Sequence, residues 1–234
     1  MKRAFILGLL VLCFASACND TTTKDEGPKG MSLFTPLTSA ETGIDFNNLV
    51  ENQKDFNVFK YRNFYNGGGV AIGDVNNDGL PDIYMTANME PNKLYINKGG
   101  FQFEEISASA GVQGDKPWST GVLMVDVNND GFLDIYVSNA GTPTGNNHDN
   151  DLYINNGDLT FTEKAEEYNL AKTGFTTHAS FFDYDKDGDL DAYILNNSSI
   201  PVSSLGYAAS RNIRAKDWNV PDIFKGVGDL LLRN

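Results

Sequence analysis

The chain of 234 residues is 41% hydrophobic and 12% aromatic, a composition that excludes wholesale disorder and allows one sizeable core or two small ones. Its 18 lysine and arginine residues stand against 31 aspartate and glutamate residues, so the formal net charge is −13. Affinity for nucleic acid rests on basic side chains that neutralise phosphates. The charge therefore excludes a nucleic-acid partner and favours cations.

Residues 1–17 have the pattern of an export signal, with a basic start, an apolar run from Ala4 to Phe14 and small residues before Cys18. The run is too short to span a bilayer as a helix. The sequence Ala-Ser-Ala-Cys resembles the lipobox of bacterial lipoproteins, in which the cysteine is lipidated and becomes the N-terminus. We therefore expect a lipid anchor at Cys18 and a bacterial outer-membrane or cell-surface protein. A soluble secreted protein is the alternative.

The mature chain is expected to begin with a tether and to lack an internal disulfide. Cys18 would be its only cysteine, because Cys13 lies within the signal. Residues 18–31 are polar and show no apolar periodicity, which predicts a flexible segment. The folded domain is expected over residues 32–234.

Short alternating or β-branched runs separated by turn residues begin at Gly67, and they predict strands in units of four. The first unit reads GVAIGD, DIYMTAN, NKLYINK and FQFEEI, and the second reads GVLMVD, DIYVSN, DLYINN and LTFTEKA. The third contains ASFFD, DAYILNN and, after a long segment from Ser198 to Gly228, DLLLRN. The expected units span 67–112, 119–170 and 176–234.

The units recur every roughly 50 to 60 residues, which predicts an all-β propeller of four-stranded blades. Upstream, Phe34 to Ile44 resembles the ends of the fourth strands, Phe103 to Val112 and Phe161 to Leu170. Either Phe34 to Thr38 completes the third unit and three blades close, or further blades lie beyond Asn234. Propellers have about four to eight blades, so we expect an incomplete fragment with about three. The aromatic stretch 45–66 is expected to cross one face.

An acidic nonapeptide with glycine at its sixth place joins the first two strands of each unit. Oxygen-bearing side chains stand at its first, third, fifth and ninth places, and the seventh residue offers its carbonyl. Calcium takes about six to eight oxygen ligands, and this spacing lets them converge. The glycine permits the sharp turn. The expected ligands are Asp74, Asn76, Asp78, Leu80 and Asp82; Asp126, Asn128, Asp130, Phe132 and Asp134; and Asp183, Asp185, Asp187, Asp189 and Asp191.

Two alternatives to these calcium sites can be weighed. An EF-hand requires a glutamate at the twelfth place, where the three loops have Met85, Val137 and Ile194. A hairpin that binds nothing would also favour Asp, Asn and Gly, but turn chemistry does not demand a carboxylate at the ninth place of three loops. The third loop has the most carboxylates, so we expect it to bind calcium tightest, with a dissociation constant of about 0.1 to 1 mM.

The loops and the strands before them resemble the FG-GAP and VCBS repeats of integrin-alpha-like β-propellers. The longer run that includes FYNGGGVAIGDVNNDGLPDIY, WSTGVLMVDVNNDGFLDIYVSN and FFDYDKDGDLDAY is similar to the bacterial relatives of cartilage acidic protein, the ASPIC/UnbV-associated family. The resemblance implies calcium binding, an extracellular place and, as is usual for such propellers, seven blades. It implies no settled ligand or reaction. The ASPIC and UnbV module of that family is not seen in this sequence.

A partner surface is expected at the ends of the blades away from the acidic loops. The connections between second and third strands vary most in length there, and long loops on a rigid scaffold tend to carry function. The longest contains a basic and aromatic cluster, which predicts a glycan or protein partner. A packing insertion is the alternative. The cluster comprises Tyr207, Arg211, Arg214, Lys216 and Trp218.

The sequence contains no catalytic constellation that we recognise. It lacks a Gly-x-Ser-x-Gly elbow, a phosphate-cradling loop and zinc-ligand spacing. The two histidines, His148 and His178, are expected in core or lining roles. We therefore expect a binding scaffold. The propeller part of an extracellular glycan-cleaving enzyme is the alternative.

Overall fold

The computed structural model describes residues 33–142, 145, 147–197, 217 and 228–234. Residues Leu37–Asn234 form one compact unit. The expected signal, Cys18 and the tether lie outside the described residues, as do Tyr207, Arg211, Arg214, Lys216 and Trp218. No helix within the described residues is long and apolar enough to cross a membrane.

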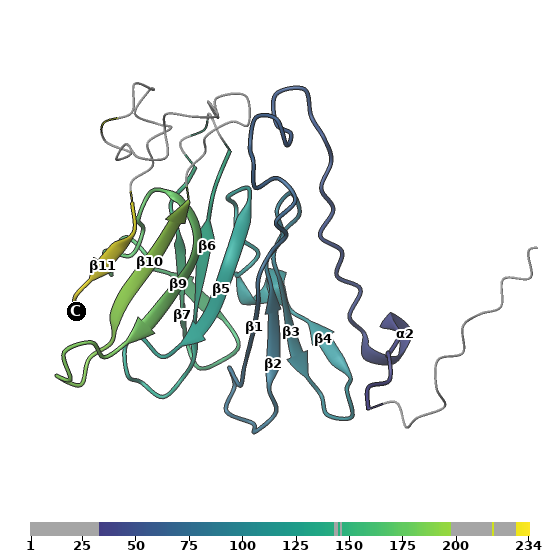
Figure 1. Cartoon of the computed structure of the whole chain (residues 1–234). Coiled ribbons are helices and arrows are strands. Elements are labelled where there is room, and N and C mark those ends of the chain that lie inside the picture. The colour runs from purple at the N-terminus through teal and green to yellow at the C-terminus, as the bar shows by residue number, and fades with distance from the viewer. Residues whose placement is uncertain (1–32, 143–144, 146, 198–216, 218–227) are drawn as a thin grey trace, which may run out of the picture. The chain divides into compact units, whose positions relative to one another are not determined.

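Three antiparallel sheets follow one another along the compact unit (Figure 1). Sheet I has the order β1-β2-β3-β4, sheet II the order β5-β6-β7-β8, and sheet III has β10 between β9 and β11. The strands of sheet I are β1 (Val70–Gly73), β2 (Asp82–Met85), β3 (Lys93–Asn97) and β4 (Phe103–Glu105). Those of sheet II are β5 (Ser119–Val125), β6 (Asp134–Asn139), β7 (Asp151–Asn155) and β8 (Phe161–Glu163). Those of sheet III are β9 (Phe175–Phe182), β10 (Asp191–Asn197) and β11 (Leu230–Leu232).

The sheets share one register. Tyr84 pairs with Leu94 in sheet I, Tyr136 with Leu152 in sheet II and Tyr193 with Leu231 in sheet III. The predicted order of strands is therefore confirmed. The alternation of side chains in each strand gives every sheet two faces, and in sheets I and II both faces carry apolar residues.

The core lies between successive sheets. Tyr84 and Leu94 of sheet I pack in one cluster with Ile135 of sheet II. Leu152, from the opposite face of sheet II, packs in a second cluster with Ile194 of sheet III. Each sheet thus buries one face against the next sheet, as blades of a propeller do. The expected class, an all-β partial propeller of four-stranded blades, is confirmed.

The first strands of the three sheets approach one another closely. A Cβ on Gly69 would lie 2.6 Å from the Thr120 carbonyl oxygen, and one on Gly121 would lie 2.5 Å from the Thr177 carbonyl oxygen. Thr120 adds a tie, because its hydroxyl donates to the Thr176 carbonyl of β9 at 2.7 Å. Glycine is required at positions 69 and 121 because the neighbouring backbone occupies the space of a side chain.

The aromatic stretch 45–66 packs at the end of the sheets away from the acidic loops. We call the cluster of Phe56, Tyr61, Phe64, Trp118 and Phe175 the aromatic cap. The Phe56 and Trp118 rings lie 4.5 Å apart between centroids, and those of Phe64 and Trp118 lie 5.0 Å apart. The expected crossing segment is therefore a second core that joins residues before sheet I to the starts of sheets II and III.

The stretch from Phe34 to Thr38, which was one of two candidates for completing the third unit, contains no strand. This stretch is irregular, and sheet III contains three strands within the described residues. Instead, two short helices follow the fourth-strand positions, α2 (Ser39–Thr42) and α3 (Ser107–Ala110).

Candidate metal centres

The first aspartate of each acidic loop organises the turn through backbone hydrogen bonds. Asp74 accepts from the Gly79 N–H at 2.7 Å and the Asp78 N–H at 3.1 Å. In the second loop Asp126 accepts from the Gly131 and Asp130 N–H groups at 2.9 and 3.1 Å. The two loops therefore have the same geometry, which the shared spacing of Asp, Asn and Gly produces.

The third and fifth places face each other inside the first two loops. The Asn76 amide donates to Asp78 Oδ2 at 3.0 Å, and the Asn128 amide donates to Asp130 Oδ2 at 2.8 Å. The fifth residue also accepts from the seventh, since Leu80 N–H lies 2.8 Å from Asp78 Oδ1. Phe132 N–H makes the equivalent bond to Asp130 at 2.9 Å. The third- and fifth-place side chains therefore contact each other in both loops.

Two places in each loop have a left-handed backbone. The sixth-place glycines, Gly79, Gly131 and Gly188, have φ values of 86°, 90° and 99°. The fourth place is also left-handed, with φ of 59° at Asn77, 57° at Asn129 and 63° at Lys186. Asparagine tolerates this conformation better than most residues. The Asn-Asn pairs of the first two loops thus indicate this turn in the sequence, although we did not predict it from them. The third loop has Lys186 at the same place.

The ninth-place aspartate is buried at the base of each loop. Asp82 and Asp134 are fully buried and Asp191 nearly so. Asp82 accepts from Val75 N–H of its own loop at 2.9 Å and from Asn97 N–H of β3 at 2.8 Å. Burial raises the pKa of the Asp82 carboxyl, and these two N–H groups oppose the rise. The ninth place therefore ties the loop to the third strand, a role that the sequence reading did not assign.

The same connection occurs in the other two sheets. Asp134 accepts from Asn155 N–H at 2.8 Å, and Asp191 accepts from Asn234 N–H at 3.0 Å. Burial raises the pKa of Asp134 as it does that of Asp82. Each buried carboxylate oxygen has two lone pairs, so one backbone bond leaves capacity for a further contact.

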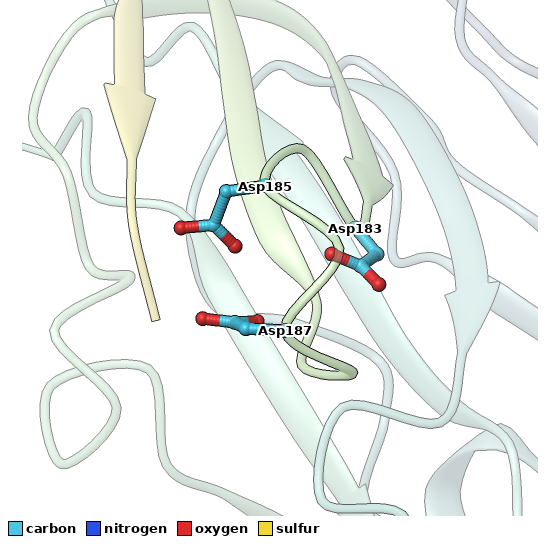
Figure 2. Close-up of side chains that lie close together, drawn as sticks. All are labelled: Asp183, Asp185 and Asp187. Atoms are coloured by element: carbon cyan, nitrogen blue, oxygen red, sulfur yellow. The ribbon is translucent and has the colours of Figure 1, made fainter.

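The third loop brings three carboxylates together (Figure 2). One oxygen each of Asp183, Asp185 and Asp187 lies within 4.8 Å of the others, and all three side chains are exposed. Among the described residues this is the one group of three acidic, histidine or cysteine side chains so placed. The other loops have asparagine at the third place, so they bring together two carboxylates and an amide.

A cationic side chain already sits on the third loop. The Arg233 guanidinium lies 2.7 Å from Asp185 Oδ2 and 3.6 Å from Asp187 Oδ2. Desolvation raises the pKa of Asp185, an effect that Arg233 opposes and the Asp187 charge supports. A backbone hydrogen bond from Asp189 lowers the pKa of Asp187. Converging carboxylate oxygens are ligands of the kind that calcium takes, so the residues fit calcium.

The two histidines lie apart from the acidic loops. His148 is buried, with its ring nitrogens 2.6 Å from the Ala140 carbonyl oxygen and 2.9 Å from that of Gly145. Its ring lies 4.6 Å from that of Phe175. His178 is exposed on β9, beside Gly121 of β5. The structure thus places His148 in the core and His178 on the first strand of sheet III, beside the first strand of sheet II.

Comparison with known families matches the FG-GAP-like repeat to residues 74–137 and 140–194, more than half of the chain. The chain belongs to the FG-GAP-like repeat family. The first match begins at the first residue of the first acidic loop, and the second passes through the third loop. The repeat assignment therefore covers the segments in which the described loops and sheets recur.

The FG-GAP-like chain is also similar to three curated proteins, each called cartilage acidic protein 1. The protein of Xenopus tropicalis is 32% identical over 155 residues, which cover 65% of this chain and 22% of the relative. That of Mus musculus is 29% identical over 135 residues, covering 56% and 20%. That of Homo sapiens is 36% identical over 80 residues, covering 34% and 12%. The matched part spans about a fifth or less of these relatives.

Proposed function

We propose that the chain is a calcium-binding FG-GAP-like scaffold. The observation that carries the proposal is the recurrence of the acidic loop in three sheets, with one hydrogen-bonded geometry in the first two loops and three converging carboxylates in the third. Carboxylates that face one another repel unless a cation neutralises them. Calcium bound there would stabilise the hairpins, because a ligand that binds only the folded state raises its stability.

Calorimetric titration of the purified chain, freed of metal with a chelator, tests this proposal. We expect binding with dissociation constants of about 0.1 to 1 mM, and a higher melting temperature in calcium. Asp78→Asn and Asp130→Asn should each weaken one site, because each replaces a carboxylate with a neutral amide of the same shape. Glu166→Gln, an exposed change outside the loops, is the control. An absence of heat and of thermal shift at several millimolar calcium would reject the proposal.

The scaffold is proposed to act outside the cell, held by a lipid at Cys18. The export pattern of residues 1–17 and the sequence Ala-Ser-Ala-Cys support this localisation. In a bacterial host, the wild-type chain should fractionate with membranes and Cys18→Ala should be released. Equal partition of the two would contradict the anchor.

The proposed partner is a glycan or a protein that binds the segment between β10 and β11. The support is the basic and aromatic composition of that segment in an acidic chain. Binding to immobilised glycans and to cell-surface proteins should fall when Arg214 and Trp218 are replaced by alanine, while Phe59→Ala leaves it unchanged. Binding that both replacements leave intact would remove the proposal. A binding role, and no catalytic one, is what we propose for the chain.

A further inference from the structure

A polar cavity of about 450 Å³ lies beside sheet II, where the connection at residues 111–116 meets β7 and β8. Cavities that hold small ligands have volumes of about 300 to 1,000 Å³. The lining includes three carboxylates, those of Asp115, Asp151 and Glu163, and one ammonium, that of Lys116. Because acidic groups are in excess, the cavity favours a polar ligand with a positive charge.

Lys116 already has a partner inside the cavity. Its ammonium contacts the carboxylate of Asp151, which also accepts from the Asn139 amide at 2.8 Å. The Asp151 side chain is 2% exposed, so this ion pair belongs to the folded interior. The one ammonium of the lining thus balances one of the three carboxylates, and those of Asp115 and Glu163 remain.

In sheet I, the glutamate at the equivalent place has a lysine partner. Glu105 of β4 and Glu163 of β8 have the same register in their sheets. The Lys93 ammonium lies 3.2 Å from the Glu105 carboxylate. In sheet II the place of Lys93 is taken by Asp151. Among the described residues, Glu163 therefore has no ion pair, and the cavity lies beside it.

The Tyr153 hydroxyl is a second group that has lost its partner. Tyr153 is 4% exposed and lines the cavity, and its hydroxyl oxygen lies 3.6 Å from the position of a Cβ on Gly114. In sheet I the equivalent Tyr95 hydroxyl donates to Asp45 at 3.2 Å. Gln113 stands at the place of Asp45, two residues after the glycine that ends the short helix. Within the part of the chain that the structure describes, the Tyr153 hydroxyl makes no hydrogen bond.

Both unpartnered groups are held in place and are ready to bind. Glu163 Oε1 accepts from the Ala165 N–H at 2.9 Å and the Leu152 N–H at 3.3 Å, so its carboxylate is oriented and Oε2 is available. Burial and the charge of Asp151 raise the pKa of the Tyr153 hydroxyl, which therefore keeps its proton at neutral pH. A buried hydroxyl without a partner costs free energy, and a ligand oxygen would recover it.

We propose that the cavity binds a small organic ligand in which a primary ammonium group and a hydroxyl group stand on neighbouring carbons. The ammonium would lie beside Glu163 as that of Lys93 lies beside Glu105, and the hydroxyl would pair with Tyr153. Amino sugars and shorter amino alcohols, such as those of lipid headgroups, share this chemistry. No residue of the cavity belongs to the acidic loops or to the segment between β10 and β11, so the proposal does not rest on the proposed calcium sites or partner.

Calorimetric titration of the purified, metal-free chain tests the proposal with glucosamine, N-acetylglucosamine and glucose, at a pH where the amine is protonated. We expect glucosamine to bind, and the two neutral sugars to bind at least about tenfold more weakly, because they bring no charge to Glu163. Ethanolamine separates the two sources: affinity equal to or above that of glucosamine indicates an amino alcohol, and weaker binding indicates an amino sugar. Equal affinity for glucose and glucosamine, or no heat with either amine at about 20 mM, would overturn the proposal.

Two substitutions that preserve side-chain shape test the named contacts, with melting temperatures to show that the variants fold. Glu163→Gln should weaken glucosamine binding about tenfold, since the amide keeps an oxygen for the backbone and loses the charge. Tyr153→Phe should weaken glucosamine about threefold or more and leave binding of ethylamine, which has no hydroxyl, unchanged. Glu105→Gln, the same change at the equivalent place of sheet I, is the control and should have no effect. Full affinity in Glu163→Gln, or equal losses in Glu163→Gln and Glu105→Gln, would place the ligand elsewhere and overturn the proposal.

Discussion

At the scale of single residues, the acidic loops differ most at the fourth place. The backbone there is left-handed in all three, with asparagine in the first two loops and Lys186 in the third. A left-handed conformation is strained for a residue with a long side chain. The backbone of the third loop is therefore more strained at Lys186 than the backbones of the first two loops are at their asparagines.

Lys186→Asn should stabilise the metal-free chain by about 0.5 to 1 kcal/mol, because asparagine adopts the left-handed conformation more readily. Gly188→Ala should destabilise it by about 1 kcal/mol, since φ is 99° there and no neighbouring atom would clash. Urea unfolding in chelator measures both. Lys54→Asn, at an exposed site outside the loops, is the control. A destabilised Lys186→Asn would show that the backbone conformation does not limit this loop.

The ion pairs of Arg233 are a second feature that distinguishes the third loop. Its guanidinium contacts Asp185 and Asp187, and it is 71% exposed, so the attraction is that of a surface ion pair. Calcium must compete with this charge at the third loop. The carboxylate count alone predicts that the third loop binds calcium tightest, and Arg233 acts against that ranking.

Replacing Arg233 with glutamine should therefore tighten binding at the third loop about two- to fivefold, whereas Arg233→Lys should keep the wild-type affinity. Terbium luminescence excited through Tyr184 isolates this loop, because the equivalent residues of the other loops are Val75 and Val127. Weaker terbium binding in Arg233→Gln would mean that the guanidinium supports the loaded loop instead of competing with the metal.

At the scale of the elements, the buried ninth-place aspartates hold each acidic loop to its sheet. Asp134 receives N–H groups from Val127 of the loop and Asn155 of β7. These two bonds connect a turn to a strand that follows it much later in the sequence. The carboxylate is therefore structural even without a metal.

Asp134→Asn should destabilise the metal-free chain by about 1 to 3 kcal/mol, because the amide turns one buried acceptor into a donor that faces an N–H group. Asp130→Asn, which changes an exposed carboxylate of the same loop, should be nearly neutral without metal. Chemical unfolding in chelator compares the two. Equal and small effects would assign Asp134 no role beyond that of Asp130.

The elements also show what the sequence could predict. Alternating β-branched and aromatic runs bounded by turn residues gave the strands and their order, because the period of two is a local property of the chain. The contacts among Asp74, Asn76 and Asp78 are equally local, since all three lie within five residues of the chain. The burial of Asp82 was missed because its partner Asn97 lies on another strand. Whether Phe34 to Thr38 would form a strand could not be decided from the sequence, because strand pairing depends on an edge elsewhere in space.

At the scale of the whole molecule, the sheets are joined at one end by the aromatic cap. Trp118 is 1% exposed and contacts the rings of Phe56, Tyr61 and Phe64. The backbone of Trp118 adds two bonds: its N–H donates to the Asn88 carbonyl at 2.8 Å, and its carbonyl accepts from the Ala140 N–H at 3.0 Å. Through its ring and its backbone, Trp118 thus connects the segment before sheet I with the start of sheet II.

Trp118 also has a left-handed backbone, with φ of 66°. Such a conformation persists only when the surroundings over-determine it, and the buried ring and the two backbone bonds do so here. Trp118→Ala should cost about 3 to 5 kcal/mol through the lost packing and leave the strained backbone in place. Trp118→Gly loses the same ring but relieves the strain. Glycine should therefore be less destabilising than alanine, by about 1 kcal/mol, the reverse of the order in regular strands and helices.

Urea unfolding of both variants, with Phe59→Ala as the exposed aromatic control, measures the difference. If alanine is the milder change, the backbone at position 118 is not strained and the ring alone holds the cap. If both variants lose little stability, the cap does not join the sheets. If both variants lose much stability and the glycine variant is the more stable of the two, ring packing holds the ends of the three sheets in spite of an unfavourable backbone conformation at position 118.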